Sequence, residues 1–245
     1  MTKRMRRIAR PENRTWGRAL AVMAIVLLVG ACAQTQSFLT SENLAEKPAN
    51  PRVLIMPTDV ELSELTTAGL LEPNAAWTAT GRSNVDAALD SLLAGRNATV
   101  VRYDKSGGAG SAAETQLLKL HSAVGSTILL HKYLPGFALP TKKDKFDWSL
   151  GQEATALRAP YGADYALFIY LRDSFASEGR KALIFVGALL GAGIRGGSQV
   201  GFASLVDLRN GEIIWFNRLV SQAGDLREPE LARGATENLL DELPL

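Results

Sequence analysis

The spacing of apolar residues predicts strands and helices that alternate along the chain. Residues 53–56 are a compact apolar run closed by Pro57, which predicts a short buried strand because proline cannot continue a central ladder. Residues 57–82 are expected to form a long loop. In residues 83–95 apolar side chains recur every three or four positions, and this period predicts an amphipathic helix. Residues 98–101 predict a second strand.

The middle of the chain is expected to be mainly helical. Ser111 and Glu114 have the spacing of a capping box, and the apolar residues that follow them at helical intervals predict a long helix. Pro135 ends this helix at the latest. Residues 141–148 mix lysine, aspartate and aromatic side chains and predict a solvated loop, whereas residues 152–157 predict a short helix.

The last third of the chain contains a strong hairpin pattern. Residues 165–171 form an apolar, aromatic-rich run that predicts a strand. In residues 200–208 and 213–219 apolar side chains alternate, and Asn210 and Gly211 between the two runs predict a type I′ turn. These features predict an antiparallel hairpin.

A final helix is expected to close the fold. Pro229 suits the first turn of a helix, and the apolar positions after it form a stripe. The expected stripe consists of Leu231, Ala235, Leu239 and Leu240. Together the elements predict an α/β (α+β) fold in which a single mixed β-sheet packs with helices and ends in a late antiparallel hairpin and a C-terminal helix.

The amino terminus has the three parts of a secretory signal. A basic region up to Arg18 is followed by eleven apolar residues, 19–29, and then by small residues directly before Cys32. This run is short for a transmembrane helix, which needs about 20 apolar residues to cross a ~30 Å hydrocarbon layer. We therefore predict a signal peptide over residues 1–31 rather than a permanent membrane span.

Residues 28–32, Leu-Val-Gly-Ala-Cys, resemble the lipobox of bacterial lipoproteins, and the only cysteine of the chain is where that motif requires it. Val29 stands where the family usually has leucine, a small apolar change. The resemblance implies that the peptide before Cys32 is cut and that Cys32 is lipidated with acyl chains such as palmitate. Several chains hold a protein durably, since each buried CH₂ contributes about 0.8 kcal/mol. The alternative is an incidental thiol in an ordinary signal peptide.

The residues after Cys32 predict where the protein resides and how it is tethered. Ala33 stands where inner-membrane lipoproteins of the best-known sorting pathway carry aspartate, so a lipid-anchored location on the periplasmic face of the outer membrane is expected. Residues 32–50 are mostly small and polar and predict a lipidated flexible tether. Residues 51–245 are then the periplasmic α/β domain.

Charge and composition exclude several classes of function. The chain has 27 basic and 25 acidic side chains, but residues 1–31 hold seven of the basic ones and a single acid, so the remainder is net acidic. Such a body is a poor nucleic-acid binder. One Cys and two His exclude a disulfide framework, a zinc ribbon and a three-histidine site within one protomer. We expect no metal, no cofactor and no nucleic-acid partner.

Residues 206–215, Val-Asp-Leu-Arg-Asn-Gly-Glu-Ile-Ile-Trp, resemble a closing hairpin that recurs in periplasmic lipoproteins. These proteins share a domain related to the curli-secretion lipoprotein and to the amino-terminal domain of TolB, and the order of their elements is similar to that expected for residues 51–245. The resemblance implies a role in envelope assembly, secretion or cell-wall synthase activation without catalysis. No binding residue can be transferred, because no functional motif matches position by position.

Residues 182–201 are the strongest candidate for a contact region. Residues 182–194 are uncharged and nearly all apolar, and Arg195 and a glycine cluster follow them. A buried strand leading into a mobile loop explains this pattern. The alternative is an exposed apolar segment that contacts a bilayer or a neighbouring protomer. A barrel strand would need in-out alternation, which this segment lacks.

Three short motifs do not predict catalysis. The spacing G-x-G-x-x-G at residues 191–196 is followed by a strand pattern, whereas nucleotide binding needs a helix there. His121 and His131 are ten residues apart, outside any H-E-x-x-H motif, and are expected to be ordinary helix histidines. Residues 196–200 lack the last glycine of a nucleophile elbow.

The sequence therefore predicts a protein that is not an enzyme. We expect a lipid-anchored periplasmic protein that binds envelope proteins in transport or envelope assembly, with Cys32 as the single assigned site residue. The alternative is an oligomeric secretion-channel component that uses the apolar, glycine-rich residues 182–201, so a homo-oligomer stays open.

Overall fold

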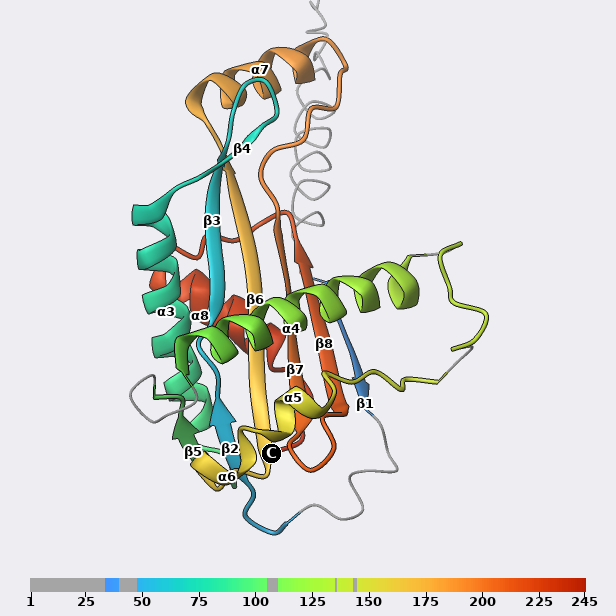
Figure 1. Ribbon diagram of the computed structural model, residues 1–245. Coiled ribbons are helices and arrows are strands. Elements are labelled where there is room, and N and C mark those ends of the chain that lie inside the picture. Colours follow the sequence, from blue (N-terminus) through green and yellow to red (C-terminus); the bar gives the residue numbers. More distant parts are fainter. Residues whose placement is uncertain (1–33, 40–47, 105–109, 135, 143–144) are drawn as a thin grey trace, which may run out of the picture. The chain divides into compact units, whose positions relative to one another are not determined.

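The computed structural model describes residues 34–39, 48–104, 110–134, 136–142 and 145–245. Its strands form an eight-stranded mixed sheet in the order β1-β8-β7-β6-β2-β5, with β3 also pairing β6 and β4 pairing β3 (Figure 1). The strands are β1 (Gln34–Leu39), β2 (Arg52–Ile55), β3 (Asp59–Leu65), β4 (Leu71–Pro73), β5 (Thr99–Arg102), β6 (Tyr165–Ala176), β7 (Gln199–Asp207) and β8 (Ile213–Ser221). The helices are α3 (Ala75–Leu93), α4 (Gly110–Tyr133), α5 (Gln152–Thr155), α6 (Arg158–Tyr161), α7 (Glu178–Leu189) and α8 (Pro229–Leu239).

This architecture confirms the predicted α/β class, including the late antiparallel hairpin and the C-terminal helix. Strand β6 is the centre of the sheet: its first residues pair with β2 in parallel, and its later residues, from Tyr170 to Ala176, pair with β3 in parallel. Pro57 lies between β2 and β3, so the two strands follow one another along the same edge of β6. The other edge of β6 pairs antiparallel with β7.

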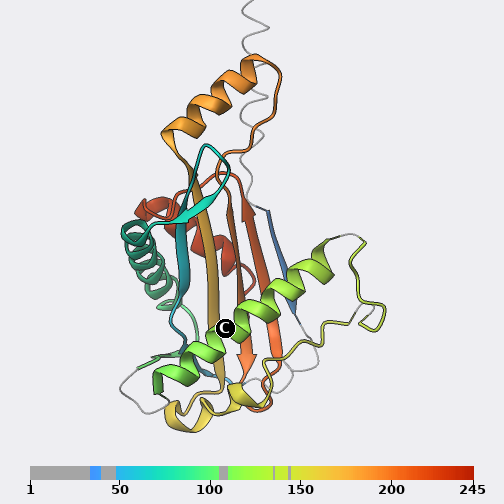
Figure 2. The same cartoon turned by 45° about the horizontal axis from the view of Figure 1, so that its top comes forward.

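Helices cover both faces of the sheet, and a separate hydrophobic core lies under each layer (Figures 1 and 2). Helices α3 and α8 pack on one face, where Leu89 and Leu239 meet Trp215 and other apolar residues of the strands. Helix α4 and the short helix α5 pack on the opposite face, around Phe168 and Phe202. Helices cover β6 on both faces, and the side chains of its first residues are apolar on both faces as well, which is typical of a central strand.

A buried amide holds α8 against the sheet. The Asn217 side chain in β8 is fully buried, and its Nδ2 donates hydrogen bonds to the carbonyl oxygens of Asn238 and Leu239 at 3.0 and 3.1 Å. Carbonyl groups at the end of a helix have no partner within that helix, so this side chain satisfies two of them. The predicted stripe is correct at Ala235, Leu239 and Leu240, which are buried, but wrong at Leu231, which is exposed.

The tether predicted for residues 32–50 is wrong over β1. Gln34–Leu39 forms an antiparallel strand along the free edge of β8, with Gln34 opposite Val220 and Leu39 opposite Trp215. Residues 40–47 lie outside the described part of the chain. Although Gln34–Leu39 is mostly polar, an edge strand needs only backbone partners on one side, and β8 supplies them.

The long loop predicted for residues 57–82 is also wrong, because β3, β4 and the first turns of α3 occupy most of it. Helix α3 begins at Ala75 rather than at residue 83, since the Asn74 side chain accepts a hydrogen bond from the Trp77 backbone N–H and caps it. The predicted strand at 165–171 extends to Ala176.

The turn of the β7–β8 hairpin differs from the predicted type I′. Gly211 has a φ of +78°, but Asn210 does not take a left-handed conformation. Instead, the Asn210 side chain accepts a hydrogen bond from the Glu212 backbone N–H, and the Gly211 N–H donates to the Asp207 carbonyl. These local bonds favour a longer loop than the two-residue turn that the sequence predicts.

Candidate functional site

The apolar segment that follows β6 forms a helix, which corrects the prediction of a buried strand. Helix α7 (Glu178–Leu189) begins at Ser177, whose side chain accepts a hydrogen bond from the Arg180 backbone N–H. Its one buried residue is Gly187, which packs against Ile194 in the segment that returns to β7. An apolar run with no period does not distinguish strand from helix.

Helix α7 exposes its apolar side chains to solvent instead of packing them on the sheet. Phe185 is 66% exposed and Leu190, directly after the helix, is 80% exposed. On an ideal helix of about 100° per residue, the exposed apolar residues span about 160° of the circumference, and Gly187, which packs on Ile194, lies just outside this arc, about 40° from Leu183. The exposed set is Leu183, Phe185, Val186, Leu189 and Leu190.

The connection between β3 and β4 supports the start of α7. The Ser177 backbone N–H donates to the Leu65 carbonyl at 3.0 Å, and Arg180 Nη1 donates to the Thr66 carbonyl at 3.3 Å. The same connection carries two exposed leucines, Leu70 and Leu71. We use the term apolar tip for these exposed residues of both segments, namely Leu70, Leu71, Leu183, Phe185, Val186, Leu189 and Leu190.

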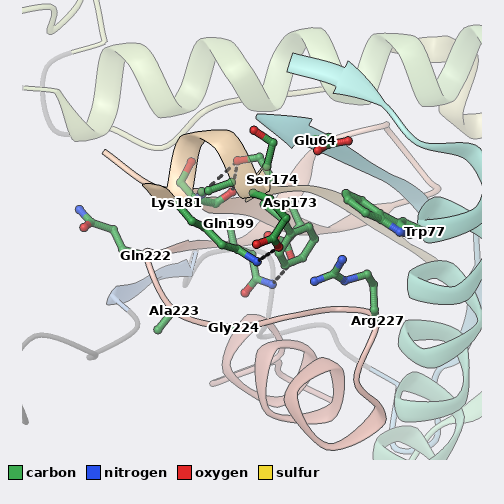
Figure 3. Close-up of a pocket in the computed structure, with 16 residues that line it drawn as sticks. Glu64, Trp77, Asp173, Ser174, Lys181, Gln199, Gln222, Ala223, Gly224 and Arg227 are labelled. Carbon is green, nitrogen blue, oxygen red and sulfur yellow. Dashed lines mark hydrogen bonds and ion pairs between the residues drawn. The ribbon is translucent and has the colours of Figure 1, made fainter. Parts of the chain in front are cut away.

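A cavity of about 360 Å³, lined by both polar and apolar side chains, lies at the base of α7 (Figure 3). Its walls come from the end of β6, the start of β7 and the residues that follow β8. Glu64 and Trp77 on one side and Lys181 and Gln222 on another are among the side chains that line it (Figure 3).

Asp173, a buried carboxylate in β6, forms part of this cavity. Its Oδ2 accepts hydrogen bonds from Gln199 Nε2 at 3.1 Å and from the Leu226 backbone N–H at 3.2 Å. Burial raises the pKa of Asp173 to about 6, although these hydrogen bonds act in the opposite direction. Because these hydrogen-bond partners come from β7 and from the chain after β8, Asp173 joins three segments at the base of the tip.

Arg227 forms another wall of the cavity by stacking on aromatic rings. Its guanidinium carbon lies 3.8 Å from the ring centre of Phe175 and 4.5 Å from that of Trp77. Arg227 Nη2 also lies 2.6 Å from Asp225 Oδ2. With its charge paired and its plane stacked, Arg227 is held rigidly and serves to position the segment after β8.

The two histidines have the ordinary roles that the sequence predicts. His121 in α4 is buried between Phe168 and Phe202, and its Nε2 lies 2.9 Å from Ser204 Oγ. Burial lowers the pKa of His121 to about 3, so the ring is neutral at physiological pH. His131 is near the other end of α4, with its Nδ1 2.6 Å from the Phe137 carbonyl oxygen. The structure does not bring the two histidines together.

Other sequence predictions are placed as follows. Cys32, the predicted lipidation site, lies outside the described residues. The glycines of residues 191–196 follow α7 and precede β7, so no helix begins after them, as expected. Sequence patterns missed the cavity at Asp173 and Arg227 because its walls come from segments far apart in the chain. An Asp within an apolar strand was the one local signal available.

The described residues contain no cluster of three or more His, Cys, Asp or Glu side chains that could hold a metal ion. Within the same part of the chain, no helix combines the length and the apolar character that a membrane span requires.

Comparisons with known proteins give only remote likenesses. No protein-family model matches the chain, and no curated protein matches it. Among solved structures, a PelC dodecamer from Paraburkholderia phytofirmans is similar with a TM-score of 0.35 and 12% identity, over 85% of this chain and 95% of that chain. A point variant of the same dodecamer gives a TM-score of 0.34 and 11% identity, over 86% and 95% of the two chains. The function proposed below is therefore derived from the residues of this chain.

Proposed function

We propose that this chain is a lipid-anchored protein of the bacterial cell envelope that acts by binding other envelope components rather than by catalysis. Cys32 carries the proposal, because the only cysteine of the chain ends a lipobox-like sequence directly after a signal-like segment. Ala33 after it favours delivery to the periplasmic face of the outer membrane.

The apolar tip supports a binding role. Monomeric soluble proteins rarely leave a contiguous group of large apolar side chains uncovered, and such groups mark contact sites. Phe185, Leu189 and Leu190 are among the most exposed large apolar side chains of the described residues, and they lie on one short helix or directly after it. An acyl anchor would raise the local concentration of this surface near envelope partners without adding a contact.

Replacing Cys32 by Ala tests the anchor. We expect wild-type protein to incorporate a palmitate analogue and to fractionate with the outer membrane, whereas the Cys32→Ala variant incorporates none. Val29→Leu, which restores the usual lipobox residue, is the matched control and should be labelled like the wild type. Wild-type protein without acyl modification at Cys32 would contradict the proposal.

A second candidate function is an oligomeric secretion-channel component, and the apolar surface of α7 is the observation that favours it. In that case neighbouring protomers would cover Phe185 and Leu189, and substitution of either residue by Asp should dissociate the assembly. Ring-shaped particles and pore conductance in detergent-purified protein support this function. A monodisperse monomer without conductance contradicts it.

A further inference from the structure

We propose that the apolar tip inserts into the membrane that holds the lipid anchor, so that the protein contacts the bilayer at two places, through the acyl chains of Cys32 and through α7. The inference rests on the proposed lipidation of Cys32. The proposed function leaves the partner of the apolar tip open among envelope components, and this inference identifies that partner as the lipid bilayer.

The register of β1 brings the start of the described chain to the end of the sheet that carries α7. Gln34 pairs with Val220, near the end of β8, and the next residue of β8, Ser221, pairs with Gln199 at the start of β7. Gln199 directly follows the segment that returns from α7. Figure 1 shows α7 beyond this end of the sheet, across the direction of the strands.

Chain length then limits how far this end of the sheet can be from an acylated Cys32. Gln34 comes two residues after Cys32 in the sequence, with only Ala33 between them. An extended chain spans at most about 3.6 Å per residue, so the two residues reach roughly 7 Å. Since strand β1 begins so soon after Cys32, a lipidated Cys32 holds this end of the sheet close to the headgroups.

The shape and chemistry of the tip fit a bilayer surface. A helix that binds in the plane of a membrane buries its apolar face about 5–10 Å deep and keeps cationic side chains at the headgroup level. The apolar arc of α7 is exposed and excludes Gly187, which contacts Ile194, and Leu70 and Leu71 extend the same tip.

Charges at the base of the tip suit anionic lipid. Residues 177–198 contain the basic residues Arg180, Lys181 and Arg195 and one acid, Glu178. Lys181 Nζ lies 2.7 Å from Glu178 Oε1, and Arg180 donates to the Arg195 carbonyl oxygen, so these side chains gather beside the start of α7. Residues 177–198 therefore carry a net positive charge, which favours contact with phosphate headgroups, and Glu64 and Glu72 of the neighbouring strands β3 and β4 act in the opposite direction.

A thiol-reactive fluorescent probe tests the insertion directly. The full lipidated chain carrying Phe185→Cys would be labelled with an environment-sensitive dye and placed in vesicles of phosphatidylethanolamine and phosphatidylglycerol. Acylation blocks the thiol of Cys32, so the dye reports one position. Ala159→Cys, on α6 at the opposite end of the sheet, is the matched control. Phe185 and Ala159 are both exposed, so neither substitution should disturb folding.

We expect the dye at position 185 to emit at shorter wavelength in vesicles and to lose most of its emission to lipids that carry a quencher on the acyl chain. The dye at position 159 should show neither effect. Adding Leu189→Asp should return the emission at position 185 toward that in water, because a carboxylate in the apolar arc resists insertion.

Three results overturn the inference. If Cys32 is acylated and the dye at position 185 still emits as in water and is not quenched, the membrane insertion of the tip is contradicted. The proposed function is unaffected by that result. A blue shift without quenching by lipid also overturns it, since a protein partner or a second copy then covers the tip. The intact mass of the same sample reports acylation separately; an unmodified Cys32 contradicts the proposed function and removes the length limit on which the inference depends.

Discussion

Gly125 in α4 lies directly against the ring of Phe202 in β7. A Cβ atom at this glycine would be 2.0 Å from Cε2 and 2.4 Å from Cζ of the phenylalanine. The absence of a side chain therefore sets how closely α4 approaches the sheet. Phe202 also stacks on Tyr170 and Phe216, at 4.6 and 5.6 Å between ring centres, so it has little freedom to move aside.

Gly125→Ala is expected to destabilise the protein. The added methyl group must displace Phe202 or shift α4, and overpacking of this kind costs about 1–3 kcal/mol. Gly234→Ala in α8 is the control, because a Cβ there meets nothing within 4 Å. It should stabilise by about 0.5–1 kcal/mol, since alanine favours helix over glycine. Urea unfolding measures both, and equal stability of the two variants would contradict the packing argument.

His121 is expected to make the protein less stable in acid. Its pKa falls from an ordinary 6.5 to about 3 on folding because the ring is buried. Below pH 6.5 His121 is protonated in the unfolded chain but not in the folded chain. The free energy of unfolding therefore falls by up to about 1.4 kcal/mol per pH unit between pH 6.5 and 3.

Comparison with His121→Gln isolates this contribution. The variant should be less stable at neutral pH, because Gln lacks the ring that packs on Phe168 and Phe202. Its deficit relative to wild type should shrink as the pH falls from 6.5. A deficit that stays constant in urea titrations between pH 7 and 4 would contradict a buried neutral imidazole.

Asp173 has the opposite effect within the same pH range. Its pKa rises from 3.8 to about 6 on folding, so the folded chain holds its proton more tightly than the unfolded chain. Its contribution to stability is therefore greatest below pH 4 and is lost as the pH rises to about 6, a change of roughly 3 kcal/mol. Asp173→Asn should gain stability relative to wild type over this window. Asp147→Asn, at an exposed position, is the control and should show no such gain.

Strand β1 is expected to be protected from solvent exchange, unlike a flexible tether. Phe38 stacks on Phe146 at 5.6 Å between ring centres, and Tyr133 Oη donates to the Gln36 carbonyl at 2.8 Å. Phe38→Leu should speed amide exchange in β1 roughly fivefold, because a ring pair contributes about 1 kcal/mol. Phe137→Leu, at an exposed phenylalanine, should leave exchange in β1 unchanged. Fast exchange throughout β1 in the wild type would contradict the β1–β8 pairing.

The candidate site was only partly predictable from the sequence. Residues 182–201 stood out by composition, and an exposed apolar contact segment was the alternative to a buried strand. The helical conformation, the support from Thr66 and the cavity at Asp173 were not predictable. The last two depend on residues more than twenty positions apart, whereas periodicity reports only neighbours within about two turns. The helical conformation depends on Ser177 and Ile194, which are closer in sequence but lie outside the apolar run.

The sequence by itself determined the elements whose apolar residues repeat with one clear period: the two arms of the late hairpin, helix α4 and helix α8. A period of two or of 3.6 commits one face to the core wherever the element lies. Only the tertiary structure decided that polar Gln34–Leu39 is a strand and that apolar 182–189 is exposed helix. The first depends on the free edge of β8 and the second on Ser177 and Ile194, which cap and back the helix. In both segments the conformation depends on contacts that the segment's own pattern of apolar and polar residues does not specify: backbone hydrogen bonds to β8 for the first, and the Ser177 and Ile194 side chains for the second.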